Sequence, residues 1–208
     1  AVFGECIAKD DISALRRSYR KYKTLLSAGM LVLFSCAGIL IVPFIRLYTK
    51  GITDADYIRP AFAWIFLLAE AVNCLVLPCA SLPVAANHLR QTRWGAYSEA
   101  LINIVLSCIL IKWNPLLGVA IGTLAATVFR AVYYMAYSAK NILHLPLHRI
   151  LLPFFGTSFL FFAVTLCGAF LIQAVKIKSF LSWTLWGGLC FLSVAFPVAI
   201  AVRKRYSR

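Results

Sequence analysis

The sequence contains few charged residues and very few acidic ones. Charged residues make up 13% of the chain, and only seven of its 208 residues are Asp or Glu. A typical soluble domain is about 25% charged and about 45–50% apolar, whereas this chain is 62% hydrophobic. A soluble fold of this length could not bury so much apolar surface. The composition therefore excludes an ordinary soluble domain and indicates a protein that lies in a bilayer.

The chain also lacks the residue patterns of a metal site or a catalytic centre. Its seven cysteines form no CxxC pair, and most lie within apolar runs, where cysteine behaves as a small hydrophobic residue. No nucleophile and base are recognisable as a pair. No stretch alternates apolar and polar residues as a half-buried strand does. We therefore predict an all-α protein that needs no cofactor and no metal.

Six apolar stretches are long enough to cross a membrane as helices, since a span needs about 20 mainly apolar residues. Short linkers that are polar or contain proline separate them. The predicted spans are Leu25–Ile45, Ala61–Ala86, Gly95–Ile111, Leu116–Ser138, Ile150–Ala174 and Phe180–Val202. The third is short, and it extends naturally back into the preceding linker. The pattern predicts a polytopic helical bundle with six transmembrane helices.

Basic residues are distributed unevenly between the two sides of these spans. If the spans alternate in direction, the richer side holds fourteen of them: Lys9, Arg16, Arg17, Arg20, Lys21, Lys23, Arg90, Arg93, Lys140, Arg149, Arg203, Lys204, Arg205 and Arg208. The poorer side holds six: Arg46, Lys50, Arg59, Lys112, Lys176 and Lys178. The positive-inside rule places the richer side, with the C-terminus, in the cytoplasm. Topology thus explains the net charge of +14, and we expect no nucleic-acid partner.

The basic segment Asp10–Lys23 precedes the first span. Asp10 or Asp11 can cap a helix, and four residues are spaced for one helical face: Ile12, Leu15, Tyr19 and Tyr22. This predicts a cytoplasmic amphipathic connector within residues 1–24. It is either a stop-transfer anchor or a site for anionic lipid or substrate phosphate. Residues 1–8 read like the tail of an earlier apolar helix, so we expect the C-terminal part of a longer protein.

Three ionisable side chains lie well inside predicted spans: Glu70, Glu99 and Arg130. Such groups are costly in hydrocarbon, and they normally face a bundle interior or an aqueous cavity. They mark either a functional site or a neutralising pair that joins two helices. At 1.5 Å per residue, Glu99 and Arg130 lie ~21 and ~25 Å from the turn at 112–115. This similar depth on adjacent antiparallel helices predicts that they pair, directly or through water.

Polar and small residues accompany these charges. Asn103 follows Glu99 by four residues and Asn73 follows Glu70 by three, so each pair shares a helical face. After Arg130 come three aromatic residues that fit an interfacial belt or platforms for sugar rings: Tyr133, Tyr134 and Tyr137. Two small residues in the fourth span allow close helix packing: Gly118 and Gly122.

Several motifs resemble those of polysaccharide flippases. They are Leu47–Asp54, Tyr57–Pro60, Glu99–Ser107, Gly118–Leu124, and Phe129–Arg130 with Tyr133–Tyr134. These proteins export lipid-linked oligosaccharides and belong to the multidrug/oligosaccharidyl-lipid/polysaccharide (MATE-like) superfamily. The resemblance covers roughly residues 1–145, whereas the last two spans match only in hydropathy.

The resemblance implies two six-helix lobes that enclose a central cavity and work by alternating access. Residues 25–140 would supply four helices of the C-terminal lobe, and residues 141–208 two additional spans with a basic cytoplasmic tail. The implied activity is the flipping of undecaprenyl-pyrophosphate-linked oligosaccharide across the bacterial inner membrane, coupled to H⁺ or Na⁺, together with the N-terminal lobe of the same protein. Arg130 would be the cavity cation and Arg59 and Arg93 would lie at the portals. Asn73 and Asn103 would contact substrate, and Glu70 and Glu99 would serve in coupling.

Two other functions remain open at this point. One is a cation-coupled multidrug antiporter of the same superfamily, in which the cavity would favour carboxylates and Arg130 would be unfavourable. The other is a membrane glycosyltransferase or polymerase that acts on lipid-linked sugars. Asp54 and Asp56 in an external loop could then hold a divalent metal, although two aspartates in a short loop are commonly just solvated.

Overall fold

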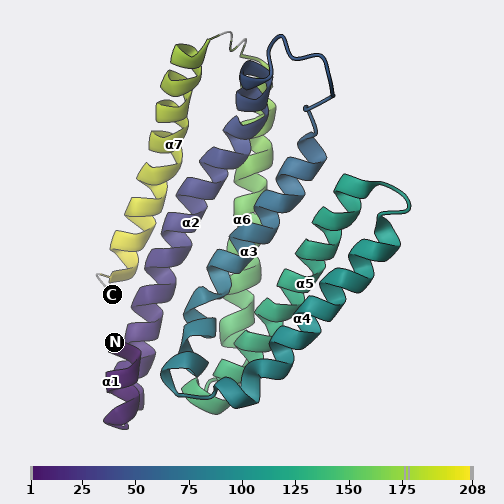
Figure 1. Ribbon diagram of the computed structural model, residues 1–208. Coiled ribbons are helices and arrows are strands. Elements are labelled where there is room, and N and C mark those ends of the chain that lie inside the picture. Colours follow the sequence, from purple (N-terminus) through teal and green to yellow (C-terminus); the bar gives the residue numbers. More distant parts are fainter. Residues whose placement is uncertain (1, 176, 178, 207–208) are drawn as a thin grey trace.

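The computed structural model describes residues 2–175, 177 and 179–206, and this part of the chain consists of helices and their connections, without strands (Figure 1). Its elements are α1 (Val2–Ala8), α2 (Ile12–Tyr48), α3 (Pro60–Ala85), α4 (Leu89–Leu110), α5 (Pro115–Ser138), the short π-helix η1 (Ala139–Leu143), α6 (His148–Gln173) and α7 (Phe180–Tyr206). The predicted all-α class is confirmed. Residue 1 of the expected preceding helix and three residues of the charge count lie outside the described residues: Lys176, Lys178 and Arg208.

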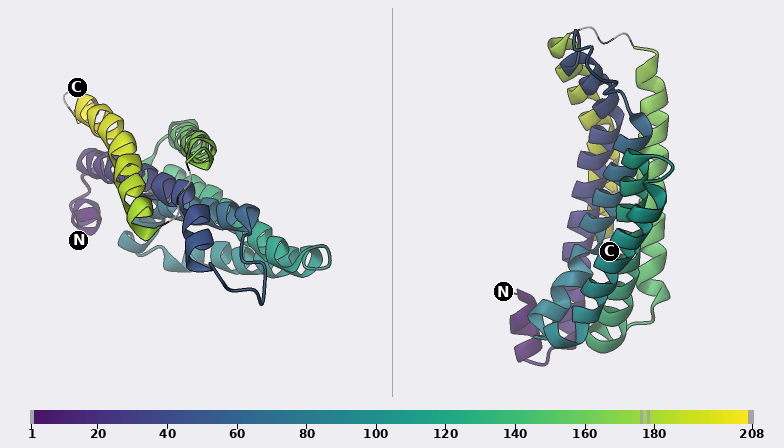
Figure 2. Two further views of the ribbon diagram at one scale, coloured as in Figure 1. Left: turned by 90° about the horizontal axis from the view of Figure 1, so that it is seen from above. Right: turned by 45° about the vertical axis from the view of Figure 1, so that its right-hand side comes forward.

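The long helices stand side by side in a slab. Across it the order is α7, α2, α3, α5 and α4, and α6 covers one face by packing mainly on α2 and touching α3 and α5 (Figure 2). In Figure 1 the upper end holds the α2–α3, α4–α5 and α6–α7 connections, and the lower end holds the α3–α4 and α5–α6 connections and α1. The two sets of linkers that the charge count separates thus lie at opposite ends of the bundle.

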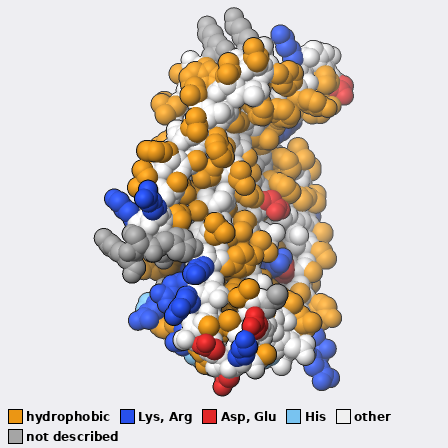
Figure 3. Space-filling model, turned by 90° about the vertical axis from the view of Figure 1, so that its left-hand side faces the viewer, with side chains coloured by type: hydrophobic (Ala, Val, Ile, Leu, Met, Phe, Trp, Pro, Cys, Tyr) orange, Lys and Arg blue, Asp and Glu red, His pale blue; other side chains and the backbone are white. Residues whose placement is uncertain are grey.

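Five helices in the described part are long and apolar enough to cross a membrane: α2, α3, α5 with η1 (Pro115–Leu143), α6 and α7. The remaining predicted span, Gly95–Ile111, is the third in chain order. It corresponds to α4, which does not meet this condition. Its lower half carries Arg90 and Arg93, and Glu99 and Asn103 follow toward its middle. Figure 3 shows one face of the molecule covered largely by hydrophobic side chains, with most of the visible basic side chains in its lower half. The chain is therefore a membrane protein with several spanning helices.

Local sequence signals set the helix starts. The side chain of Asp11 accepts the backbone N–H of Ala14 at 2.9 Å and so caps α2. The same hydrogen bond holds the pKa of the Asp11 carboxyl below its usual value. From there α2 continues without a break for 37 residues, so the basic connector and the first span form one helix. Asn114 caps α5 in the same manner, with Leu117 as the donor at 3.1 Å.

The best-packed part of the core lies toward the lower end, where it is closed by polar contacts. Arg16 of α2 donates to the carbonyl oxygens of Leu143 and His144, at 2.8 and 2.9 Å, just where η1 ends. The Ser138 hydroxyl donates to the carbonyl of Cys79 at 2.8 Å. Arg16, one of the basic residues of the connector, therefore joins α2 to the end of the α5–η1 segment and is not directed at lipid or substrate.

Candidate functional site

Helices α4 and α5 form a tight antiparallel hairpin, and glycines allow their close approach. Gly118 lies so near the turn that a Cβ atom there would come within 2.6–2.8 Å of backbone atoms of Leu110 and Ile111. Gly122 lies against the side chain and backbone of Ser107. The small-residue face expected in α5 is thus turned toward α4, and it brings the polar side chains of the two helices within reach of each other.

The structure brings Glu99 and Arg130 together across this hairpin. Nη1 of Arg130 lies 3.3 Å from Oε1 of Glu99, within hydrogen-bonding and ion-pairing distance. The side chain of Glu99 is 23% exposed and that of Arg130 is 30% exposed, so the pair is largely buried but still accessible. The guanidinium also lies 5.8 Å from the ring centroid of Tyr134, at a distance typical of a cation–π contact.

Further polar contacts extend along the same seam. The Asn103 side-chain oxygen accepts from the Thr123 hydroxyl at 3.5 Å. On the lower side of the ion pair, the Tyr133 hydroxyl donates to the carbonyl of Gln91 at 3.3 Å, and the hydroxyl of Tyr137 lies 3.1 Å from Nδ1 of His88. We call these contacts the polar ladder: His88–Tyr137, Gln91–Tyr133, Glu99–Arg130 and Asn103–Thr123.

The polar ladder has a clear electrostatic consequence. A charge without a partner is unfavourable in an apolar environment, and the pairing of Glu99 with Arg130 reduces that penalty. Because neither side chain is fully buried, a competing anion could still reach Arg130 and a cation could reach Glu99. In the structure the site holds the closed ion pair.

Glu70 and Asn73 lie elsewhere, on α3. Glu70 is exposed and makes no hydrogen bond or ion pair with another described residue, and the side-chain oxygen of Asn73 is buried without a partner in the described part of the chain. On the helical wheel Asn73 lies opposite Trp64, whereas Glu70 lies about 60° from Leu67. Trp64 and Leu67 contact the α2–α6 side at Gly38. Asn73 therefore lies on the side of α3 away from the contact that Trp64 makes with Gly38.

Arg59 and Arg93 lie at opposite ends of the bundle. Arg59 is in the upper α2–α3 connection, where its Nε is 3.7 Å from a carboxylate oxygen of Asp56. Arg93 is exposed near the lower start of α4, and its guanidinium lies 5.8 Å from the ring of Trp94. The structure therefore does not bring the two residues together, and Arg59 already has an acidic partner.

The acidic pair of the α2–α3 connection is engaged locally. The Tyr57 hydroxyl donates to Asp54 at 3.0 Å, and the backbone N–H of Ile58 donates to Asp56 at 3.0 Å. Among the described residues there is no group of three or more His, Cys, Asp or Glu side chains that could hold a metal ion. The geometry therefore gives no support to metal-assisted sugar transfer at this loop.

Sequence reasoning missed part of the polar ladder. Thr123, His88 and Gln91 were not expected to take part, and the tyrosines were interpreted as an interfacial belt or sugar platforms. Each ladder pair lies at nearly equal distances on the two sides of the turn at 112–115. The spacing argument that predicts the Glu99–Arg130 pair would therefore have found the others if it had been applied to every polar residue of the hairpin.

Comparison with the models of known protein families, with curated proteins and with solved structures found no match. The functional assignment of this chain therefore depends on its site geometry and on the resemblance described above.

Proposed function

We propose that this chain is part of a membrane exporter that moves a lipid-linked oligosaccharide from the inner to the outer leaflet. The observation that carries the proposal is the accessible cation Arg130, held by Glu99 within an apolar bundle. A pyrophosphate headgroup cannot cross hydrocarbon unaided, because an unpaired charge is very costly to bury there. A guanidinium binds phosphate oxygens well, and a partner carboxylate keeps it stable while no substrate is bound.

The proposal includes α4 as a sixth span. α4 lies antiparallel to α5 along its length. Its exposed face toward the upper end is apolar, with Leu101, Ile104, Val105 and Ile109, whereas Glu99 turns toward α5. By the positive-inside rule the lower end, with the C-terminus, is cytoplasmic. The setting we propose is the bacterial inner membrane.

The mechanism we propose is alternating access against a second, N-terminal lobe. The uncovered face of the slab, with Asn73 and the accessible side of the Glu99–Arg130 pair, would line the shared cavity. Substrate phosphate would displace Glu99 from Arg130, and the released carboxylate would take up H⁺ or Na⁺. Such an exchange would couple the binding of substrate to the binding of an ion. Asn103 would orient the sugar, and Arg59 and Arg93 would lie at the two portals.

One observation favours a second candidate function, the cation-coupled multidrug antiporter. Glu70 is an exposed carboxylate without a partner among the described residues, and such a group could attract an organic cation. In the exporter Glu70 would instead bind the coupling ion. The glycosyltransferase has no comparable support, because Asp54 and Asp56 are satisfied by neighbours in their own loop.

The deciding experiment reconstitutes the whole exporter, with both lobes, in vesicles that carry a fluorescent lipid-linked oligosaccharide. Translocation is followed by the fraction of label that a membrane-impermeant quencher can reach. We expect that fraction to change with time in the presence of an H⁺ or Na⁺ gradient, and the 208-residue chain alone to be inactive. Gradient-driven movement of an organic cation, with no movement of the lipid, would establish the antiporter instead. Formation of a longer sugar chain would establish the transferase.

A further inference from the structure

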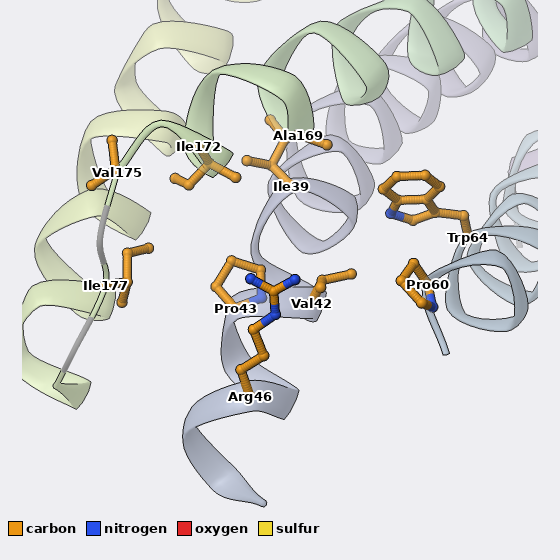
Figure 4. Close-up of a pocket in the computed structure, with 10 residues that line it drawn as sticks. All are labelled: Ile39, Val42, Pro43, Arg46, Pro60, Trp64, Ala169, Ile172, Val175 and Ile177. Atoms are coloured by element: carbon orange, nitrogen blue, oxygen red, sulfur yellow. The ribbon is translucent and has the colours of Figure 1, made fainter. Parts of the chain in front are cut away.

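A small pocket opens at the upper end of the bundle, between α2, α3 and the end of α6. Its volume is about 120 Å³, and its walls are apolar, with Ile39, Pro43, Trp64 and Ile172 among them. Among the residues that the structure describes, Arg46 is the only charged one that lines it. Figure 4 shows the guanidinium of Arg46 turned toward Pro43 and the interior of the pocket. In the described part of the chain, one cation therefore faces an otherwise hydrophobic recess.

Arg46 has no acidic partner in the described part of the chain. It makes no hydrogen bond or ion pair there, although Asp54 and Asp56 follow it closely in sequence. Asp54 accepts a hydrogen bond from the Tyr57 hydroxyl, and Asp56 accepts one from the backbone N–H of Ile58 and pairs with Arg59. The pocket thus presents an uncompensated positive charge, which is complementary to an anion.

The pocket continues into an apolar groove on the outer surface of α3 and α6. This groove has a volume of about 400 Å³ and shares Trp64 and Ala169 with the pocket. Its other lining residues are Leu166, Cys167 and Phe170, and Phe170 is 75% exposed. Ile172 of the pocket and Leu166 of the groove are six residues apart on α6, which is about 9 Å at 1.5 Å per residue. The cation therefore lies at the upper mouth, and the apolar channel leads from it toward the middle of the bundle.

We propose that the pocket and groove together bind one anionic phospholipid of the leaflet at the upper end. The lipid phosphate lies against Arg46, with which it can form charge-assisted hydrogen bonds. One acyl chain lies along Trp64 and Phe170 in the groove. Trp64 is placed where tryptophan commonly anchors a helix at the membrane interface. A soluble phosphate ester shares the phosphate chemistry, but it would leave the groove empty, so the joined geometry favours a lipid. The site is distant from the polar ladder and does not depend on the exporter proposal.

Native mass spectrometry of the purified protein tests this site. The probes are phosphatidylglycerol and phosphatidylcholine with identical acyl chains, added to the wild type and to R46Q. We expect the wild type to retain one phosphatidylglycerol in preference to phosphatidylcholine. In R46Q that preference should fall about fivefold, the effect of one basic side chain near a membrane surface. K112Q is the matched control, because Lys112 is an exposed cation at the same end in the α4–α5 connection, and it should keep the preference.

A second variant and a soluble anion separate the sources of the phosphate. Cys167 is exposed, so C167W can fill the groove with little risk to folding, and it should weaken binding of both lipids. Inorganic phosphate in millimolar excess should not displace phosphatidylglycerol. Equal losses in R46Q and K112Q would contradict the site. Displacement by phosphate together with normal lipid binding in C167W would also overturn the proposal and assign the pocket to a soluble anion.

Discussion

Replacing Arg130 by glutamine is expected to destabilise the protein and to abolish transport. The substitution leaves Glu99 largely buried and without its cation. Breaking a fully buried ion pair costs about 3–5 kcal/mol. We expect roughly 2 kcal/mol here, because the two side chains keep 30% and 23% of their exposure and the penalty of a partly exposed pair is smaller. Thermal unfolding in detergent and the yield of monodisperse protein measure the loss of stability, and the vesicle assay measures transport.

Combining E99Q with R130Q separates a structural from a functional role of the pair. The double variant has no unpaired charge, so it should recover most of the stability that each single variant loses. If the pair only joins two helices, transport should recover as well. We expect transport to remain absent, because the phosphate would have lost its cation. R90Q removes an exposed charge from α4, the helix that carries Glu99, and it should behave like the wild type. Normal expression and normal transport in R130Q would refute the role of the pair.

Substituting Gly118 by alanine is expected to separate the α4–α5 hairpin and to weaken the polar ladder. The added Cβ would meet the carbonyl carbon, the carbonyl oxygen and the next amide nitrogen at Leu110 and Ile111, all within 2.8 Å. These are backbone atoms next to the turn, so no side-chain rotation can relieve the contact. Overpacking of this kind commonly costs about 1–3 kcal/mol. Thermal unfolding should show that loss, and transport should fall because Glu99 and Arg130 no longer meet.

Gly156 of α6 offers a matched control for this substitution. It is also a helical glycine, but a Cβ there would meet nothing within 4 Å. G156A should therefore be neutral or stabilising by up to about 1 kcal/mol, since alanine favours a helix more than glycine does. If G118A and G156A gave the same unfolding temperature, the close approach of α4 and α5 would be wrong.

The parts of the fold that could be predicted follow from local rules. The apolar runs predict the long helices, and the two candidate caps Asp10 and Asp11 include the actual cap of α2, Asp11. The fixed rise per residue predicts the meeting of Glu99 with Arg130 across one short turn. Such arguments succeed because an antiparallel hairpin relates residues by their distance from a single turn. They also count Gly95–Ile111 as a span, although a short one. α4 is long enough at 22 residues, but its polar residues leave its composition short of that condition.

The remaining features depend on contacts between distant segments. Arg16 bonds to the carbonyl of Leu143, which is 127 residues away, and no local pattern distinguishes it from the other basic residues of the connector. The pocket at Arg46 needs α2, α3 and α6 together. The exposure of Glu70 depends on how α2, α5 and α6 pack around α3. Sequence periodicity identifies a polar face, but it does not say which neighbour that face will meet.

The central claim is that the α4–α5 hairpin crosses the membrane and holds the Glu99–Arg130 pair within it. Two single-cysteine variants test it most directly, L89C at the lower start of α4 and W113C at its upper end, each without the native cysteines. Both positions are exposed, at 55% and 86%, so a membrane-impermeant maleimide can reach them from whichever side they face. We predict that W113C is labelled only from outside intact cells and L89C only in inverted vesicles. Labelling of both from the same side would contradict the account.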